Sequence, residues 1–452
     1  MTEQGMTEIP VQAAMGWDRP RRRTHERARA RLRDALPAIA AACLLALAHV
    51  MFAAVNPGLA LAMSAAFALI AVVAVAMGGQ RSVTPVMLVG LALLLLYGVT
   101  GLAGPLYRAA PHLAVLFAAG CIWTTTAIAA RRLGALDTAW TVLVWTSAGY
   151  CVWVLANASS GGIGQPLHPI AAYFETPANA AVMFGLLSLV GASRLLHVLK
   201  QVDADALVGL RLMERLIRDG FGGFTLLALA LTCLLLADTR PGILMTLGVL
   251  IGYAWWDTLP ITTREHRGRL VRIGVVAAPL AALVLATSGL ALGLLRDETV
   301  APGIGLSDEN PNLQRLNAYT AVWLESPVTG HGLGSAATEV APVTTLHNAK
   351  ALLAPGGTHN VLLAWVVEGG LLGLTLLIAL LTAAHIVMAR TFGTRRAPRT
   401  FARLGFMASG LLLLHGVTDS ALNLPSAIWL YAFIIGAACG LAPSKRDETP
   451  AA

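Results

Sequence analysis

The chain has 452 residues, of which 56% are hydrophobic and only 12% are charged, and its mean hydropathy is +0.69. This composition excludes an ordinary soluble domain and is typical of a protein that crosses a membrane many times. The net charge of +8 does not indicate nucleic-acid binding, because no basic stripe interleaved with aromatic residues lies on a soluble segment.

Twelve apolar runs are long enough to cross the hydrocarbon core as helices, which takes about 20 residues each. We therefore predict an all-α, polytopic membrane protein. In chain order the predicted spans are 36–55, 58–77, 84–104, 112–130, 138–157, 178–193, 220–237, 241–260, 272–295, 359–389, 404–422 and 425–442.

Basic residues indicate the orientation of these spans. If the N-terminus is inside, all but five of the 32 Lys and Arg residues fall on the cytosolic side, where such residues are retained. The predicted organisation is a cytosolic Arg-rich tail over 1–35, transmembrane helices 1–9 over 36–295, a large periplasmic loop over 296–358, transmembrane helices 10–12 over 359–442 and a cytosolic tail over 443–452. The first 35 residues lack a cleavable apolar core, so no removable signal peptide is expected.

Two residue patterns argue against a metal or other cofactor. The five cysteines stand singly within predicted spans without CxxC spacing, so we interpret them as packing residues. An Asp-x-Asp pair is a common way to hold a divalent cation, but here that spacing occurs only at Asp203-Ala204-Asp205, on the predicted cytosolic side. No metal site is therefore predicted.

The large loop, 296–358, is too long to be a simple connection. Asn310-Pro311 is typical of a helix start, and apolar residues at helical spacing predict a helix to about Ser326. The stretch Gly330-His331-Gly332-Leu333-Gly334 then predicts a tight turn. His359-Asn360 opens the next span, which places an ionisable side chain at the membrane surface.

Four segments in the carboxy-terminal half carry residues in a family's characteristic order. They are Thr239-Arg240-Pro241-Gly242-Ile243-Leu244; Arg315 followed by Trp323, Pro327 and the Gly330–Gly334 stretch; His359-Asn360 with nine residues before Gly370-x-x-Gly373; and, more weakly, His415-Gly416-Val417-Thr418-Asp419-Ser420. Over roughly 238–425 the chain thus resembles the O-antigen ligase and polymerase superfamily, and most closely the O-antigen ligases. We interpret Gly370 and Gly373 as sites of close helix approach.

The resemblance implies an inverting glycosyltransferase of the bacterial inner membrane whose active site faces the periplasm. Its donor would be O-antigen polysaccharide on undecaprenyl diphosphate, and its acceptor would be lipid A-core. The other expected partners are membrane lipids, and no nucleic-acid partner is expected. Arg240 and Arg315 are then candidates to bind the diphosphate, since guanidinium groups match phosphate oxygens. His359 is the candidate general base. Asn360, His331 and Asp419 are candidate substrate-binding residues.

Other readings stay open at this stage. A polysaccharide polymerase or a protein O-oligosaccharyltransferase of the same superfamily would differ only in its acceptor, which is a property of the pocket. Twelve helices also suit a secondary transporter, although the polar candidates gather at the outer boundary rather than near the midplane. Arg240 can be read as a snorkelling anchor, Arg315 as a loop charge and His359 as a residue that merely begins a helix.

Overall fold

The structure, a computed structural model, describes most of the chain. Described are residues 18–51, 57–78, 104–159, 174, 177–204, 219–237, 239–258, 311–345, 348–352, 361–393, 396–418 and 424–441, with isolated positions at 90–92, 95–96, 98–99 and 214. All regular elements in these residues are helical, so the predicted all-α class is confirmed. Helices lie at ten of the twelve predicted spans. Of the other two, 84–104 is described only at 90–92, 95–96, 98–99 and 104, and 272–295 lies outside the described residues.

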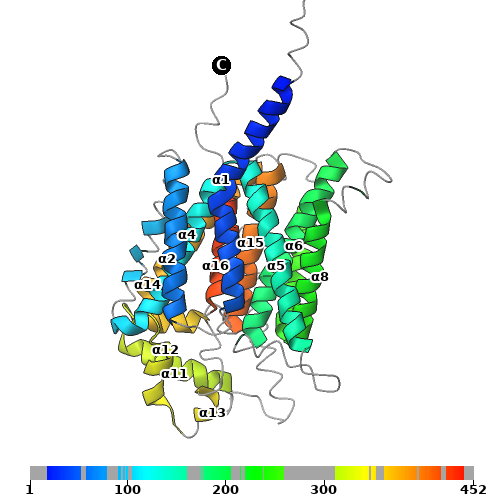
Figure 1. Cartoon of the computed structure of the whole chain (residues 1–452). Helices are drawn as coiled ribbons and strands as arrows, with labels where there is room; N and C mark the ends of the chain where they lie inside the picture. Colours follow the sequence, from blue (N-terminus) through cyan, green and yellow to red (C-terminus); the bar gives the residue numbers. More distant parts are fainter. Residues whose placement is uncertain are drawn as a thin grey trace, which may run out of the picture.

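Long helices pack side by side into a bundle (Figure 1). They are α1 (Asp18–Met51), α2 (Pro57–Gly78), α4 (Leu106–Ala130), α5 (Leu133–Ser159), α6 (Pro177–Ala204), α8 (Phe221–Leu236), α9 (Arg240–Thr258), α14 (Val361–Arg390), α15 (Arg396–Thr418) and α16 (Pro425–Gly440). By length and composition six of them, α1, α2, α4, α5, α6 and α14, are suited to crossing a membrane, and α8 and α16 are shorter apolar helices. The chain is thus a polytopic membrane protein.

Helix α4 is central to the packing of the bundle, because it lies against both α2 and α16. Two polar side chains on these helices find partners across the contacts, which a bilayer without water favours. The indole Nε1 of Trp429 donates to the Val115 carbonyl at 2.9 Å, and the hydroxyl of Ser64 donates to the Ala114 carbonyl at 2.6 Å. Elsewhere in the bundle α1 packs on α5 and α6 packs on α8.

A buried ion pair joins α9 to α15 near the ends where α9 finishes and α15 begins. Nη1 of Arg403 lies 2.9 Å from Oδ1 of Asp257, and both side chains are almost completely buried. The Arg403 guanidinium also lies 5.7 Å from the ring centre of Trp256. This contact fixes the register of two helices whose other ends carry Arg240 and His415.

Short helices form a cap at one end of the bundle, opposite the end beyond which α1 begins (Figure 1). They are α11 (Pro311–Glu325), α12 (Ala336–Glu339), η7 (Ala341–Val343) and α13 (Ala349–Leu352). The helix predicted from Pro311 to about Ser326 is confirmed as α11. The cap has a small core of its own, in which Tyr319 and Val322 of α11 meet Ala364 and Val367 of α14.

Candidate active site

Helix α14 is interrupted at Gly370, whose backbone is non-helical with φ 60° and ψ −166°. The interruption divides α14 into an outer half-helix, Val361–Gly369, and an inner half-helix, Leu371–Arg390. At 1.5 Å per residue the inner half-helix alone is about 30 Å long, which is enough to cross a bilayer. The span predicted over 359–389 is therefore interrupted by a feature that apolar periodicity did not reveal, and the outer half-helix belongs to the cap.

The segment Pro327–Gly334, here named the glycine turn, fills this interruption. A break in a helix leaves backbone donors and acceptors that need partners. Four hydrogen bonds of 2.8–3.0 Å supply them: His331 N–H to the Val367 carbonyl, Gly332 N–H to the Glu368 carbonyl, Leu371 N–H to the Pro327 carbonyl and Leu372 N–H to the Val328 carbonyl. The turn thus pairs with the chain on both sides of Gly370.

Glycine is required where the two backbones meet. Gly330 has φ +68°, and a Cβ atom there would lie 2.4 Å from the Glu368 carbonyl oxygen. Gly370 has φ +60°, and a Cβ atom there would lie 2.3 Å from the Val328 carbonyl oxygen. Both positions combine a left-handed backbone with a contact that no side chain fits. The predicted tight turn is confirmed. Gly370 was interpreted as a site of close helix approach, but the segment that approaches it is this turn and not a helix.

The other end of the glycine turn rests on α4. Gly334 approaches His112 so closely that a Cβ atom would lie 2.8 Å from the imidazole ring. One turn earlier on α4, Nη1 of Arg108 donates to the Thr338 hydroxyl at 3.0 Å and lies 3.4 Å from a Glu339 carboxylate oxygen. Arg108 therefore ties α4 to α12, and the cap is attached to the bundle through α4 as well as α14.

The predicted site residue His331 has a contact within the cap. Its Nε2 lies 2.9 Å from the carbonyl oxygen of Val322 on α11. The Trp323 indole donates to the Pro327 carbonyl at 3.2 Å, so α11 and the start of the turn are joined a second time. The ring of His331 thus holds the glycine turn against α11.

Arg315, another predicted site residue, lies half-buried on α11, one helical turn before Tyr319. Burial raises the pKa of Tyr319 to about 12; the nearby positive charge of Arg315 opposes this rise and the negative charge of Glu368 adds to it. Tyr319 is therefore a neutral hydroxyl group near neutral pH. Arg315, Tyr319 and Glu368 lie within electrostatic reach of one another.

Sequence reasoning missed Glu368. Its half-buried side chain lies near the backbone N–H groups of Gly334 and Ala336. A signal was present, because a glutamate within a predicted membrane span is by default a candidate for a functional role.

Three of the four family-like segments meet where α9 begins, α15 ends and α14 begins. Gly242, in the first turn of α9, approaches His415 so that a Cβ atom would lie 3.4 Å from Cε1 of the ring. The next residue, Gly416, approaches Val361, the first residue of α14. A Cβ atom at Gly416 would lie 3.4 Å from the Cβ atom of Val361. The fourth segment joins them because α11 packs on the outer half-helix.

The remaining predicted residues are tied to this meeting point through the chain. Arg240 is the first residue of α9, and its side chain is outside the described part. His359, Asn360 and Asp419 lie outside the described residues. Asn360 directly precedes Val361 and Asp419 directly follows Thr418 in the sequence. The first turns of α9 and α14 both lie here, and helix N-termini favour anions.

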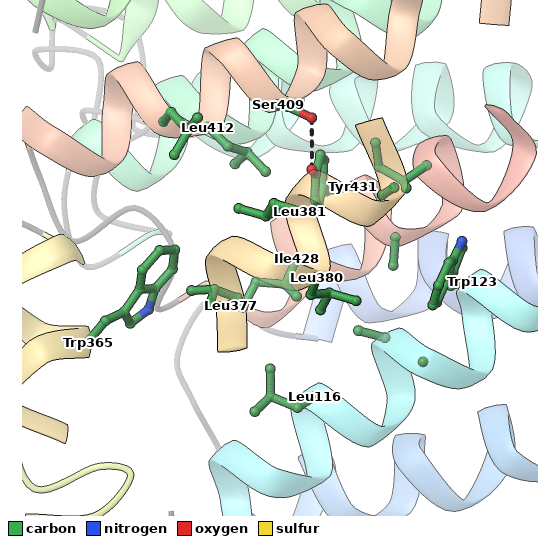
Figure 2. Close-up of a pocket in the computed structure, with 16 residues that line it drawn as sticks. Leu116, Trp123, Trp365, Leu377, Leu380, Leu381, Ser409, Leu412, Ile428 and Tyr431 are labelled. Carbon is green, nitrogen blue, oxygen red and sulfur yellow. Dashed lines mark hydrogen bonds between the residues drawn. The ribbon is translucent and has the colours of Figure 1, made fainter. Parts of the chain in front are cut away.

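An apolar cavity of about 180 Å³ lies beside the site, between α4, the inner half-helix, α15 and α16 (Figure 2). Figure 2 shows Leu377, Leu380 and Leu381 of the inner half-helix between Trp365, which comes from the outer half-helix, and Trp123 of α4. The polar groups of Ser409 and Tyr431 are hydrogen-bonded to each other at 2.8 Å. The cavity therefore presents a hydrocarbon-like surface that begins at the cap.

The fold and the site define a polytopic helical membrane protein in which helix ends meet beneath a cap that contains Arg315 and contacts Arg108. Residues 225–378 match the family model described as O-Antigen ligase, whereas no curated protein matches the chain. The matched segment includes α9, α11, the glycine turn and the break in α14. This match confirms the sequence resemblance to the O-antigen ligase family over these residues.

Proposed function

We propose that the protein transfers O-antigen polysaccharide from undecaprenyl diphosphate to lipid A-core on the periplasmic face of the bacterial inner membrane. The observation that carries this proposal is the meeting of the starts of α9 and α14 with the end of α15, beneath a cap that holds Arg315. These are the segments whose residues resemble the ligases. The membrane-embedded, glycosyltransferase-like character of the family supports the same reaction class.

The diphosphate is the group that most needs stabilisation, because negative charge grows on it as the bond to the sugar breaks. Arg240 and Arg315 are the residues assigned to it. A guanidinium group stays charged at any accessible pH and offers two parallel hydrogen bonds to phosphate oxygens. The positive ends of α9 and α14 add to the attraction.

His359 is the assigned general base. An unperturbed imidazole titrates near pH 6.5, so roughly half or more of it is neutral at physiological pH. A hydroxyl of the acceptor attacks the anomeric carbon, its proton passes to His359, and the bond from that carbon to the diphosphate oxygen breaks. Attack from the face opposite the diphosphate inverts the anomeric centre in one displacement. Asn360, Asp419 and His331 are assigned to substrate binding around this centre.

The apolar cavity supports a lipid-linked donor. A polyprenyl chain is pure hydrocarbon, and the cavity between α4, the inner half-helix, α15 and α16 is lined almost wholly by apolar side chains. Trp365 joins this cavity to the outer half-helix, which follows His359 in the chain. A donor placed there would have its tail in the membrane and its diphosphate at the cap. The excess of basic residues on the side opposite the cap supports a periplasmic site.

A lipopolysaccharide gel tests this function. A strain that lacks the gene is complemented with wild type or with His359→Ala, and both lipopolysaccharide and lipid-linked polymer are analysed. We expect unsubstituted core with accumulated lipid-linked polymer in the deletion and in His359→Ala, and a full ladder with wild type. Core that carries a single repeat in the deletion would make the protein a polymerase. An unchanged ladder would contradict any role in lipopolysaccharide and direct the search to glycoproteins or transport.

A further inference from the structure

A second cavity lies at the far end of the bundle from the cap. It has a volume of about 210 Å³ and is formed by α1, the last residues of α2 and α4, and the turn that follows α4. Helix α4 meets the cap at Arg108, near its start, whereas this cavity lies at its end. A helix of 25 residues is about 37 Å long at 1.5 Å per residue, so the cavity is separate from the candidate active site.

The lining of this cavity combines charged and apolar side chains. Asp34, Arg131 and Arg132 supply the charges, and Met77 of α2 and Ile128 of α4 are among the apolar residues. The apolar spans of α2 and α4 both end beside it, on the side predicted to face the cytosol. The cavity therefore lies where the hydrocarbon of a bilayer gives way to lipid headgroups and water.

The two arginines stand in a short turn between α4 and α5 whose backbone is fixed by hydrogen bonds. The N–H of Arg131 donates to the Ile128 carbonyl at 3.3 Å, and that of Arg132 donates to the Ala129 carbonyl at 3.0 Å. The Arg132 carbonyl accepts the N–H of Ala135, in the first turn of α5, at 2.8 Å. The backbone of both arginines is thus in place before any ligand binds, which lowers the entropy lost on binding.

The charges of the lining favour an anion. Asp34 forms an ion pair with Arg132, and its Oδ1 also lies 3.9 Å from Nε of Arg33 on α1. Two cations thus share the one carboxylate of the lining, while Arg131 adds a further positive charge. Guanidinium groups match the geometry of phosphate oxygens. The cavity therefore suits a ligand that carries a phosphate group.

We propose that this cavity binds the headgroup of an anionic phospholipid, with the phosphate at Arg131 and Arg132 and the first methylene groups of the acyl chains against α2 and α4. A free phosphate ion would use the arginines alone, whereas a phospholipid also uses the apolar part of the lining. Basic pockets between membrane helices on the cytosolic side bind anionic lipid headgroups in this way. The inference does not rest on the proposed transfer reaction.

A lipid in this cavity contacts three helices at once. Helices α1, α2 and α4 pack on one another, and each contributes residues to the lining. A ligand that binds the folded state and not the unfolded chain stabilises the fold by mass action. Binding of the lipid should therefore raise the thermal stability of the bundle.

Native mass spectrometry of the full-length protein in detergent measures the binding. The protein is titrated with phosphatidylglycerol or with phosphatidylcholine of the same acyl chains, and the dissociation constants of the first bound lipid are compared. Only phosphatidylglycerol carries a net negative charge, so we expect it to bind about ten-fold or more tightly. Equal affinity for the two lipids would overturn the proposal.

Arg131→Gln removes the guanidinium group and keeps a side chain that forms hydrogen bonds. We expect it to weaken phosphatidylglycerol binding about ten-fold, the scale of a hydrogen bond to a charged group. Arg390→Gln is the matched control, because Arg390 is exposed at the end of α14, on the same side of the bundle, and does not line the cavity. Wild-type affinity in Arg131→Gln, or an equal loss in both variants, would overturn the proposal.

Asp34→Asn separates binding by charge from a structural role of the turn. It removes a negative charge that repels phosphate, and it also breaks the ion pair with Arg132. A phosphate site predicts phosphatidylglycerol binding about three-fold tighter than in wild type. Arginines that only hold the fold predict weaker binding, as in Arg131→Gln, and that result would overturn the proposal.

Thermal unfolding in detergent distinguishes a lipid from a free anion. Phosphatidylglycerol should raise the melting temperature of wild type, whereas inorganic phosphate should not. Arg131→Gln without added lipid should melt with wild type and should gain little from phosphatidylglycerol. Stabilisation by inorganic phosphate alone would overturn the assignment of a lipid, and a lower melting temperature of Arg131→Gln without lipid would make its loss of binding a folding defect.

Discussion

The bundle and the cap are held together by different parts of the chain. In the bundle, continuous helices pack through side chains, as where Trp429 of α16 meets α4, and through helical glycines such as Gly440, which approaches the Ala127 carbonyl of α4. In the cap, the glycine turn and the interrupted α14 pair through backbone groups, and Gly330 and Gly370 face each other's backbone. Side-chain packing tolerates changes that keep volume. Backbone pairing at left-handed glycines does not, because an added methyl group at Gly330 or Gly370 meets both a carbonyl oxygen and an unfavourable backbone conformation.

The largest effect on transfer is expected from Gly370→Ala. The added Cβ atom meets the Val328 carbonyl and the backbone resists φ +60°, so the turn must move away from α14. We expect transfer to fall about 100-fold, the scale of a small misplacement of reacting groups. Gly149→Ala on α5 is the control, since nothing lies within 4 Å of its added Cβ atom, and it should keep wild-type transfer. Equal activity of the two variants would contradict the prediction that transfer requires glycine at position 370.

A smaller effect is expected from Arg315→Lys. An ammonium group keeps the charge and loses the planar pair of hydrogen bonds, a loss that corresponds to about ten-fold in transfer. Initial rates at saturating acceptor and varied donor measure it. A rate equal to that of wild type would show that Arg315 supplies only a generic charge.

In the bundle, Arg403→Ala should affect stability rather than chemistry. It leaves Asp257 as a buried charge without its ion-pair partner, which costs about 3–5 kcal/mol in proteins. Thermal unfolding in detergent should show the loss, while transfer per folded molecule stays near wild type. The double variant Asp257→Leu, Arg403→Met replaces both partners with apolar residues, and it should recover much of the stability that Arg403→Ala loses. A variant that is fully stable but inactive would place this ion pair in the reaction.

The smallest effect is expected from a chelator. Charge on the diphosphate is assigned to arginines and helix N-termini, so EDTA should leave the transfer rate unchanged. The comparison uses the same preparation with EDTA and with added Mg²⁺ or Mn²⁺. A rate that falls with EDTA and returns with one of these cations would replace the arginine account with a metal site.

The sequence predicted the bundle well because the bilayer requires every span to be a long run of apolar residues in a helix. Apolar runs located α2 and α16 closely, and Pro311 located the start of α11. The interruption of α14 was not predicted, since Val361–Arg390 is apolar on both sides of Gly370 and its partner is a distant turn. Apolar periodicity predicts a helix, but it does not reveal where a distant segment interrupts that helix.

The segments of the candidate site were predicted from the sequence, but the contacts between them were not. Family-like order selected the segments that meet, and Arg315 was found on the helix that packs against the outer half-helix. Glu368 was missed because its nearness to Gly334 and Ala336 depends on the fold, which its residue type does not indicate. The contact of the His331 ring with Val322 was not predicted either, because it depends on the path of the chain between them.

The most direct test of the central claim is transfer by the purified protein from a defined polyprenyl-diphosphate glycan to rough lipopolysaccharide, with wild type and His359→Ala compared at equal folded concentration. We predict product with wild type and none above background with His359→Ala, while both variants melt at the same temperature. Transfer by His359→Ala at the wild-type rate would contradict a catalytic site at the start of α14.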